Sequence, residues 1–216
     1  MNPSKRATCP RCKRPLSGCL CALIPHIELE TQIWVIQHPS EQRHALNTAR
    51  FLVEGLDNAV LWVTECLADH PDLLQQLQDP GWRTELLFPG AGANQLLLAT
   101  EDSRPRRLVL LDATWRKARK LLHLNPELRA LPKVALPPGP PSRYRLRKSP
   151  LPDGVSTLEA GVRALQVLEP ELDHRALLAP FEALIESQIA AMGEVRYQAN
   201  YAGRLKLPLD PKLKDR

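Results

Sequence analysis

The sequence predicts an α/β protein with a mostly parallel β-sheet and helices on both faces of the sheet. Short apolar runs of strand length alternate with stretches whose apolar residues recur at helical spacing. The runs are apolar at consecutive positions, which is typical of parallel strands that are buried on both faces. A length of 216 residues allows one main core and a small appendage.

The expected elements follow one another along the chain. Strands are predicted at residues 32–37, 59–63, 85–88, 108–111 and 133–136. Helices are predicted at residues 47–56, 71–78, from 112–115 to 124, at 155–168 and at 173–192. Asn47 or Thr48 can cap the first helix, and Pro180 can break the last one.

The expected organisation is a zinc-binding knuckle at residues 1–28, a main domain at 29–205 and a loose tail at 206–216. No stretch approaches the roughly 18 consecutive apolar residues of a membrane span. The first thirty residues hold charges and cysteines instead of an apolar signal segment. We therefore expect a cytoplasmic protein that does not associate with a membrane.

Four of the five cysteines lie within thirteen residues, at Cys9, Cys12, Cys19 and Cys21. A Cys-x-x-Cys turn supplies two thiolates, and a second close pair can complete a four-thiolate structural zinc site. His26 is a substitute ligand if Cys19 or Cys21 points away. A redox pair is the other interpretation, but it would need neither the second pair nor basic surroundings. Cys66 stands alone and is expected to be a small buried apolar residue.

The positive charge of the chain is concentrated in three places. Residues 104–120 hold seven Lys and Arg against one acid, Asp112, and four of the six residues at 143–148 are cationic. Residues 1–21 hold five cations and no acid. Clustered cations attract a polyanion because binding releases its counterions, so nucleic acid is the partner to test. A solvated basic surface is the alternative.

Ligands of open parallel sheets bind beyond the carboxyl ends of the strands. Three predicted strands end in loops suited to this role, at residues 38–41, 88–92 and 112–115. Asp112 lies where a strand meets a helix, so it is either the N-cap of that helix, with Trp115 in the core, or a functional group. Ser156 and Glu159 have the spacing of a capping box, at a helix start that also presents amides to an anion.

Residues 111–115 carry an Asp-x-Thr-Trp signature, and the chain resembles the DTW-domain family over roughly residues 9–200. The other matching pieces are the cysteine cluster, His38-Pro39-x-Glu41, and residues 47–50, 87–90, 142–148 and 156–160. The resemblance implies that residues 29–205 form a SPOUT-like catalytic domain with a knotted cofactor site.

The resemblance also implies a function, that of a tRNA-uridine aminocarboxypropyltransferase. Such an enzyme transfers the 3-amino-3-carboxypropyl group of S-adenosylmethionine to N3 of a variable-loop uridine and releases methylthioadenosine. One alternative is a SPOUT-type RNA methyltransferase, which uses the same donor with a different carbon attacked. The other is a non-catalytic zinc-knuckle RNA-binding protein in which Asp112 and Glu159 are only helix caps. We expect a monomer or homodimer with no obligate protein partner.

The resemblance and the loop positions together assign roles to four groups of residues. The catalytic group is Asp112, Thr114 and Trp115, with Asp112 taking the N3 proton or orienting the uridine. The donor is expected to contact Phe88, Pro89, Gly90, Leu111, Ser156, Thr157 and Glu159, with Glu159 near its ammonium group. The tRNA is expected to contact Arg116, Arg143, Tyr144, Arg145, Arg147 and Lys148, with the base stacked on Tyr144 or Trp115. Zinc is expected to bind Cys9, Cys12, Cys19 and Cys21.

Overall fold

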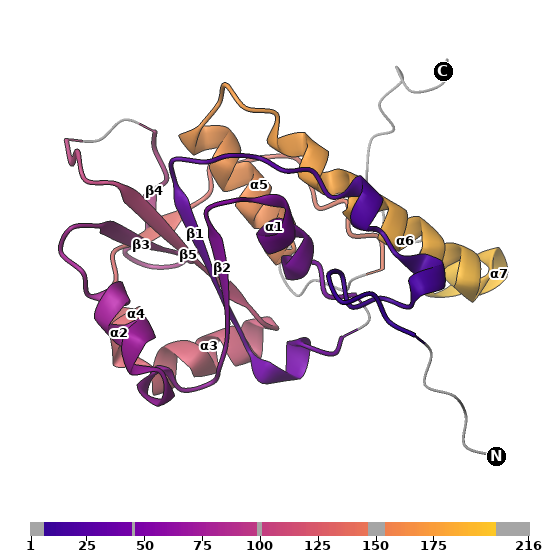
Figure 1. The fold of residues 1–216 in the computed structure, drawn as a ribbon, viewed down its shortest axis with the longest axis horizontal. Helices are drawn as coiled ribbons and strands as arrows, with labels where there is room; N and C mark the ends of the chain where they lie inside the picture. The colour runs from indigo at the N-terminus through magenta and orange to yellow at the C-terminus, as the bar shows by residue number, and fades with distance from the viewer. Residues whose placement is uncertain (1–6, 45, 99–100, 147–153, 202–216) are drawn as a thin grey trace.

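The computed structural model describes residues 7–44, 46–98, 101–146 and 154–201. These residues form an α/β fold with a parallel sheet between two layers of helices (Figure 1). Within them the sheet has six strands in the order β2-β1-β5-β3-β6-β4, and every pairing is parallel. The predicted fold class is confirmed, whereas the knot stays a prediction. The predicted tail at 206–216 lies outside the described residues.

Five strands lie within two residues of the predicted bounds. The strands are β1 (Gln32–Gln37), β2 (Ala59–Val63), β3 (Arg83–Leu87), β4 (Asn94–Gln95), β5 (Arg106–Asp112) and β6 (Lys133–Ala135). The sequence analysis did not predict β4, because its two residues are polar and exposed and therefore show no apolar pattern.

The described helices are α1 (Ala49–Gly55), α2 (Pro71–Leu77), α3 (Trp115–Leu124), α4 (Pro126–Ala130), α5 (Thr157–Leu168), α6 (Leu178–Met192) and α7 (Glu194–Asn200). Asn47 contributes the cap of α1, since its side chain accepts a hydrogen bond from the backbone N–H of Arg50 at 3.4 Å. The predicted break at Pro180 is wrong. Residues His174–Leu177 form a 3-10 turn, and Pro180 lies in the first turn of α6, where it has no intrahelical hydrogen bond to lose.

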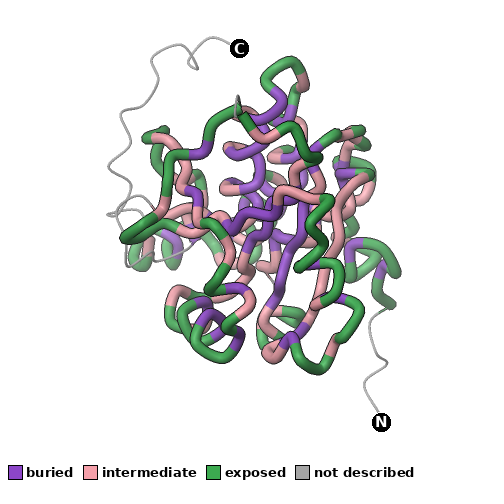
Figure 2. Tube along the Cα trace, turned by 90° about the vertical axis from the view of Figure 1, so that its left-hand side faces the viewer, coloured by how far each residue is buried: buried purple, intermediate pink, exposed green. Residues whose placement is uncertain are grey.

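The central strands β1, β3 and β5 are buried on both faces of the sheet, as their continuous apolar runs predict (Figure 2). On β1, Ile33 and Val35 belong to the core on the side of α1, α5 and α6. Trp34 and Ile36 point the other way, into the core that includes residues of α2, α3 and α4. Among the helices of the described residues, none is long and apolar enough to cross a membrane.

The amino-terminal segment is joined to the main core. Cys9, Cys12 and Ile24 are buried in the core on the α1 side of the sheet. The guanidinium of Arg11 donates to Glu54 at the end of α1, to its carboxylate at 3.0 Å and to its carbonyl at 2.9 Å. The knuckle therefore packs against the same layer of helices that covers the sheet.

Candidate active site and metal centre

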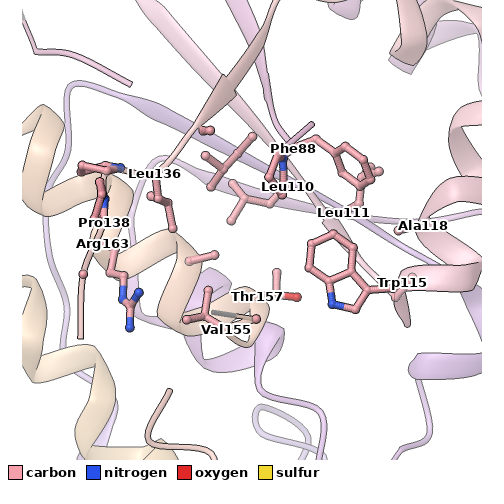
Figure 3. Close-up of a pocket in the computed structure, with 18 residues that line it drawn as sticks. Phe88, Leu110, Leu111, Trp115, Ala118, Leu136, Pro138, Val155, Thr157 and Arg163 are labelled. Atoms are coloured by element: carbon pink, nitrogen blue, oxygen red, sulfur yellow. The ribbon is translucent and has the colours of Figure 1, made fainter. Parts of the chain in front are cut away.

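A cavity of about 540 Å³ lies beside the carboxyl ends of β3, β5 and β6 (Figure 3). Its volume is within the range of small-molecule sites. The loops after these strands and the start of α5 form its walls. Its lining is largely apolar, and among the described residues its charged and hydroxyl side chains are Arg163 and Thr157, both on α5.

The cavity brings together residues that the sequence analysis took from separate segments. Phe88, Pro89, Leu111, Trp115 and Thr157 all line it. The Phe88 and Trp115 rings meet edge to face, with centroids 5.8 Å apart. The other three predicted donor contacts are not among its described lining residues: Gly90, Ser156 and Glu159.

The carboxylate of Asp112 lies at the carboxyl end of β5, half-buried, between two lining residues of the cavity. Its Oδ2 accepts a hydrogen bond from Nε2 of Gln37 at 2.7 Å, and its Oδ1 accepts one from Oγ1 of Thr157 at 2.6 Å. Asp112 therefore connects β5 to β1 on one side and to the start of α5 on the other.

The interpretation of Asp112 as the N-cap of α3 is wrong. Thr114 caps this helix, and its side chain accepts a hydrogen bond from the backbone N–H of Lys117 at 3.4 Å. The parallel ladder continues through Asp112, whose carbonyl accepts from the backbone N–H of His38 at 3.0 Å, so the helix begins at Trp115, the last residue of the predicted range of starts. Trp115 is half-buried at the cavity and not a core residue of the sheet.

Glu159 closes a capping box with Ser156, which confirms that interpretation. It is 4% exposed, and its carboxylate also accepts hydrogen bonds from the hydroxyl of Ser142 and the backbone N–H of Arg143. This carboxylate therefore anchors the segment that follows β6 to the start of α5. A contact with the donor's ammonium stays a prediction.

A second polar cluster lies between the loop after β1 and helix α3. Lys117 Nζ is 2.9 Å from Glu41 Oε1, and Lys120 Nζ is 2.6 Å from Glu65 Oε1. Nε2 of His38 lies 3.2 Å from the same oxygen of Glu65. Hydrogen bonds from Lys120 and then from His38 lower the pKa of Glu65. These pairs fix α3 against the loops that follow β1 and β2.

Three of the predicted RNA contacts make intramolecular contacts. Arg143 pairs with Glu182, and Arg145 pairs with Glu186, one turn further along α6. Tyr144 is half-buried, its ring meets Phe181 edge to face, and its hydroxyl donates to the carbonyl of Leu46 at 3.1 Å. Base stacking on Tyr144 would require this ring to leave the core. Arg147 and Lys148 lie outside the described residues.

The basic segment 104–120 is divided between the two ends of β5. At the amino end, Arg104 pairs with Asp102 and Arg106 pairs with Glu85. Arg107 is buried, with its guanidinium 4.3 Å from the Trp34 ring centroid. The cations beyond the carboxyl end lie on α3, where Arg116 and Arg119 are exposed. Only the second group lies beside the cavity.

The four cysteines of the knuckle form one cluster, whose Sγ atoms all lie within 4.8 Å of one another. Two of the pairs, Cys9 with Cys21 and Cys12 with Cys19, are 3.4 and 3.7 Å apart. A tetrahedral zinc ion with bonds of about 2.3 Å requires sulfur atoms about 3.8 Å apart, so the arrangement fits this metal. Backbone N–H groups of Cys12 and Arg11 lower the pKa of Cys9 to about 6, whereas burial raises the pKa of its neighbour Cys21 to about 12. The chain therefore has a cysteine cluster that can hold a metal ion.

Sequence reasoning missed two residues of the site. Gln37 was assigned only to a strand, although a polar residue that ends an apolar run at the carboxyl edge of a sheet is a usable signal. Arg163 was assigned to a helix, although it is the single cation between Asp153 and Leu168.

Comparison with known proteins identifies the family. Residues 6–189 match the DTW domain. The chain is 34% identical over 206 residues to a Drosophila melanogaster protein named tRNA-uridine aminocarboxypropyltransferase 2, covering 91% of this chain and 80% of that protein. It is 31% identical over 206 residues to the Mus musculus protein of the same name, covering 91% and 68%.

An Arabidopsis thaliana protein named tRNA-uridine aminocarboxypropyltransferase A is 28% identical over 233 residues, covering 94% of this chain and 84% of that protein. No solved structure matches the chain at a significant level. A family match over most of the chain, together with a relative above 30% identity that is largely covered, identifies the family. The chain belongs to the DTW-domain family.

Proposed function

We propose that this protein is a tRNA-uridine aminocarboxypropyltransferase that uses S-adenosylmethionine. The observation that carries the proposal is the carboxylate of Asp112, held at 2.6 Å by a residue of an apolar cavity large enough for a nucleoside-sized ligand. Relatives from an insect, a mammal and a plant bear this enzyme's name.

The cavity suits the donor in its chemistry. The apolar side chains of Leu87, Phe88 and Leu136 can cover an adenosine ring system, and the Arg163 guanidinium can pair with the donor's carboxylate. The donor supplies a carbon made electrophilic by its sulfonium sulfur. The sulfur bears three carbons, so the group that moves is decided by which carbon the protein holds in line with the attacking nitrogen.

The proposed role of Asp112 is to act on the acceptor, the uridine base. Uridine N3 carries a proton that must leave as the new bond to carbon forms, and an ionised carboxylate beside it can accept that proton or hold the base in place. Trp115 is the first residue of α3 and lines the same cavity, and its half-buried ring can stack on a base that is turned out of the RNA.

We propose that the cysteine cluster binds a structural zinc ion. Four protein sulfur ligands complete a tetrahedral site and leave no position open for substrate, so the metal supports the fold without entering the reaction. We further propose that the protein acts in the cytoplasm, as a monomer or homodimer, without another protein.

Nucleoside mass spectrometry tests the proposed function. Purified protein is incubated with tRNA and with donor labelled either in the methyl group or in the aminocarboxypropyl group. We expect only the second label on a uridine, together with release of methylthioadenosine. Methyl label on the RNA would establish the methyltransferase instead, and tRNA binding with neither label transferred would establish the non-catalytic RNA-binding protein.

The exposed face of α3 is the proposed contact for tRNA phosphates, because Arg116 and Arg119 lie there beside Trp115 and the cavity. Replacing both arginines by alanine is expected to weaken tRNA binding. The slope of the logarithm of affinity against the logarithm of salt concentration should fall by about 2, roughly one for each lost phosphate contact. Binding titrations at several salt concentrations measure this slope.

The matched control for this prediction is Arg175→Ala. Arg175 is also exposed but lies in the 3-10 turn before α6, on the opposite side of the sheet. It should leave the slope unchanged. An unchanged slope in the α3 variant would show that the tRNA lies on another surface.

A further inference from the structure

Gln37 is a buried amide in an apolar strand. Its side chain is 0% exposed, and the residues before it on the same face of β1 are Ile33 and Val35. Its Nε2 donates to Asp112, while its Oε1 is buried and has no hydrogen-bond partner within the described part of the chain. A buried amide with an unsatisfied oxygen lowers the stability of a fold, whereas an apolar residue at this position would not. Gln37 therefore lowers the stability of the fold relative to an apolar residue at this position.

The position of Gln37 is set by the sheet. β1 and β5 pair in register, with Gln37 directly beside Asp112. Side chains that are paired in register project to the same face of the sheet. The amide therefore reaches the carboxylate across one strand spacing, from a backbone that is itself buried and hydrogen-bonded in the parallel ladder.

The second hydrogen bond to Asp112 comes from helix α5 and not from the sheet. The Thr157 hydroxyl at the start of α5 donates to Oδ1, so each carboxylate oxygen has a separate donor. An amide nitrogen only donates hydrogen bonds, and the oxygens of the Asp112 carboxylate accept them. Gln37 and Thr157 together fix the plane of the carboxylate.

We propose that Gln37 is a positioning residue for the transfer reaction: its amide holds the carboxylate of Asp112 in one orientation toward the uridine. This inference rests on the proposed function. A residue that orients the reacting carboxylate contributes to the transition state, so its loss lowers kcat more than it raises the donor's KM.

The test is the pair of variants Gln37→Met and Gln37→Glu, each assayed for methylthioadenosine release over a range of pH. Gln37→Met keeps the shape of the side chain and removes the amide that donates the hydrogen bond to Asp112. We expect its kcat to fall about tenfold or more at every pH, with the donor's KM changed less than about threefold.

Gln37→Glu gives a signature that a purely structural role would not. Two carboxylates within hydrogen-bond distance share one proton. At low pH the protonated Glu replaces the amide as donor, so activity is retained. As pH rises and the shared proton leaves, the two like charges repel, and we expect a fall in kcat that the parent protein lacks.

Other charged groups near residues 37 and 112 also influence the dependence of kcat on pH. They are His38, Glu41, Glu65, Lys117 and Lys120 on the β1 and α3 side, and Glu159 and Arg163 on α5. All are present in the control Gln32→Glu, which makes the same substitution at the far end of β1, where Arg107 can pair with the new carboxylate. We expect its pH profile to match the parent's.

Thr157→Val provides an independent measurement if a Gln37 variant does not fold. This substitution removes the second hydrogen bond to Asp112, and we expect kcat to fall. Thr157→Ser, which keeps the hydroxyl, should restore most of the kcat. A parent-like kcat in Gln37→Met, or a parent-like profile in folded Gln37→Glu, overturns the inference. Failure of the parent protein to place the aminocarboxypropyl group on tRNA overturns the proposed function instead.

Discussion

Asp112→Asn is expected to abolish transfer and to leave donor binding largely intact. The asparagine oxygen can accept the hydrogen bond from Gln37, and its amide can donate to the Thr157 hydroxyl after that hydroxyl rotates. The local structure is therefore tolerated, while the negative charge that accepts or orients the N3 proton is lost. Removal of such a group lowers rates by about 10² to 10⁴.

Two measurements check this expectation, namely methylthioadenosine release with tRNA present and calorimetric binding of the donor without tRNA. Asp72→Asn is the matched control, because Asp72 is an exposed acid in the first turn of α2, on the other side of the sheet. It should retain both binding and turnover. Turnover by Asp112→Asn close to that of the control would remove Asp112 from the mechanism.

The central sheet could be predicted because its strands are buried on both faces. Residues 32–37 and 106–112 contain apolar runs that neither a loop nor an amphipathic helix would contain, and both form neighbouring strands. The order β2-β1-β5-β3-β6-β4 could not be predicted, since pairing depends on contacts between segments far apart in the chain. The edge strand β4 carries too little sequence for any pattern.

The site was predicted in part, and the errors have a common physical cause. The capping box of Ser156 and Glu159 depends on residues three apart, so spacing alone revealed it. The partners of Asp112 lie 75 and 45 residues away, at Gln37 and Thr157. No local spacing reports such contacts, and this is why Asp112 was also assigned to a helix cap that Thr114 provides.

The contacts of the basic segments could not be predicted from local spacing either. Seven cations between residues 104 and 120 look uniform in the sequence, but β5 carries Arg107 to the far end of the sheet, between two tryptophan rings. Arg143 and Arg145 meet acids that the sequence places about forty residues later, on α6. Charge counts therefore indicated a polyanionic partner without locating the surface that meets it.

Cys12→Ser is expected to abolish zinc binding by the cysteine cluster and to destabilise the fold strongly. Cys12 is buried within the core that includes Val35 and Leu108, so the substitution also places a serine hydroxyl in the interior. Loss of a structural metal is among the few single changes that cost several kcal/mol. With about 3 kcal/mol lost, the melting temperature of a chain of this size falls by about 6 to 12 °C.

Metal analysis and thermal unfolding measure the two parts of this prediction. Cys66→Ser is the control, since Cys66 is half-buried and lies outside the cluster, and it should keep the parent's ratio of zinc to protein. A chelator that strips the parent protein should reproduce the loss of stability. Purified parent protein without zinc and with an unchanged melting temperature would contradict a structural metal.

The same experiment separates a structural metal from a catalytic one. Four sulfur ligands leave the ion no open position, and the cysteine cluster lies in the knuckle, outside the lining of the cavity. The rate per folded molecule should therefore stay unchanged in Cys12→Ser at a temperature where it is still folded, while the melting temperature falls. A loss of kcat without a loss of stability would instead place the metal in the reaction.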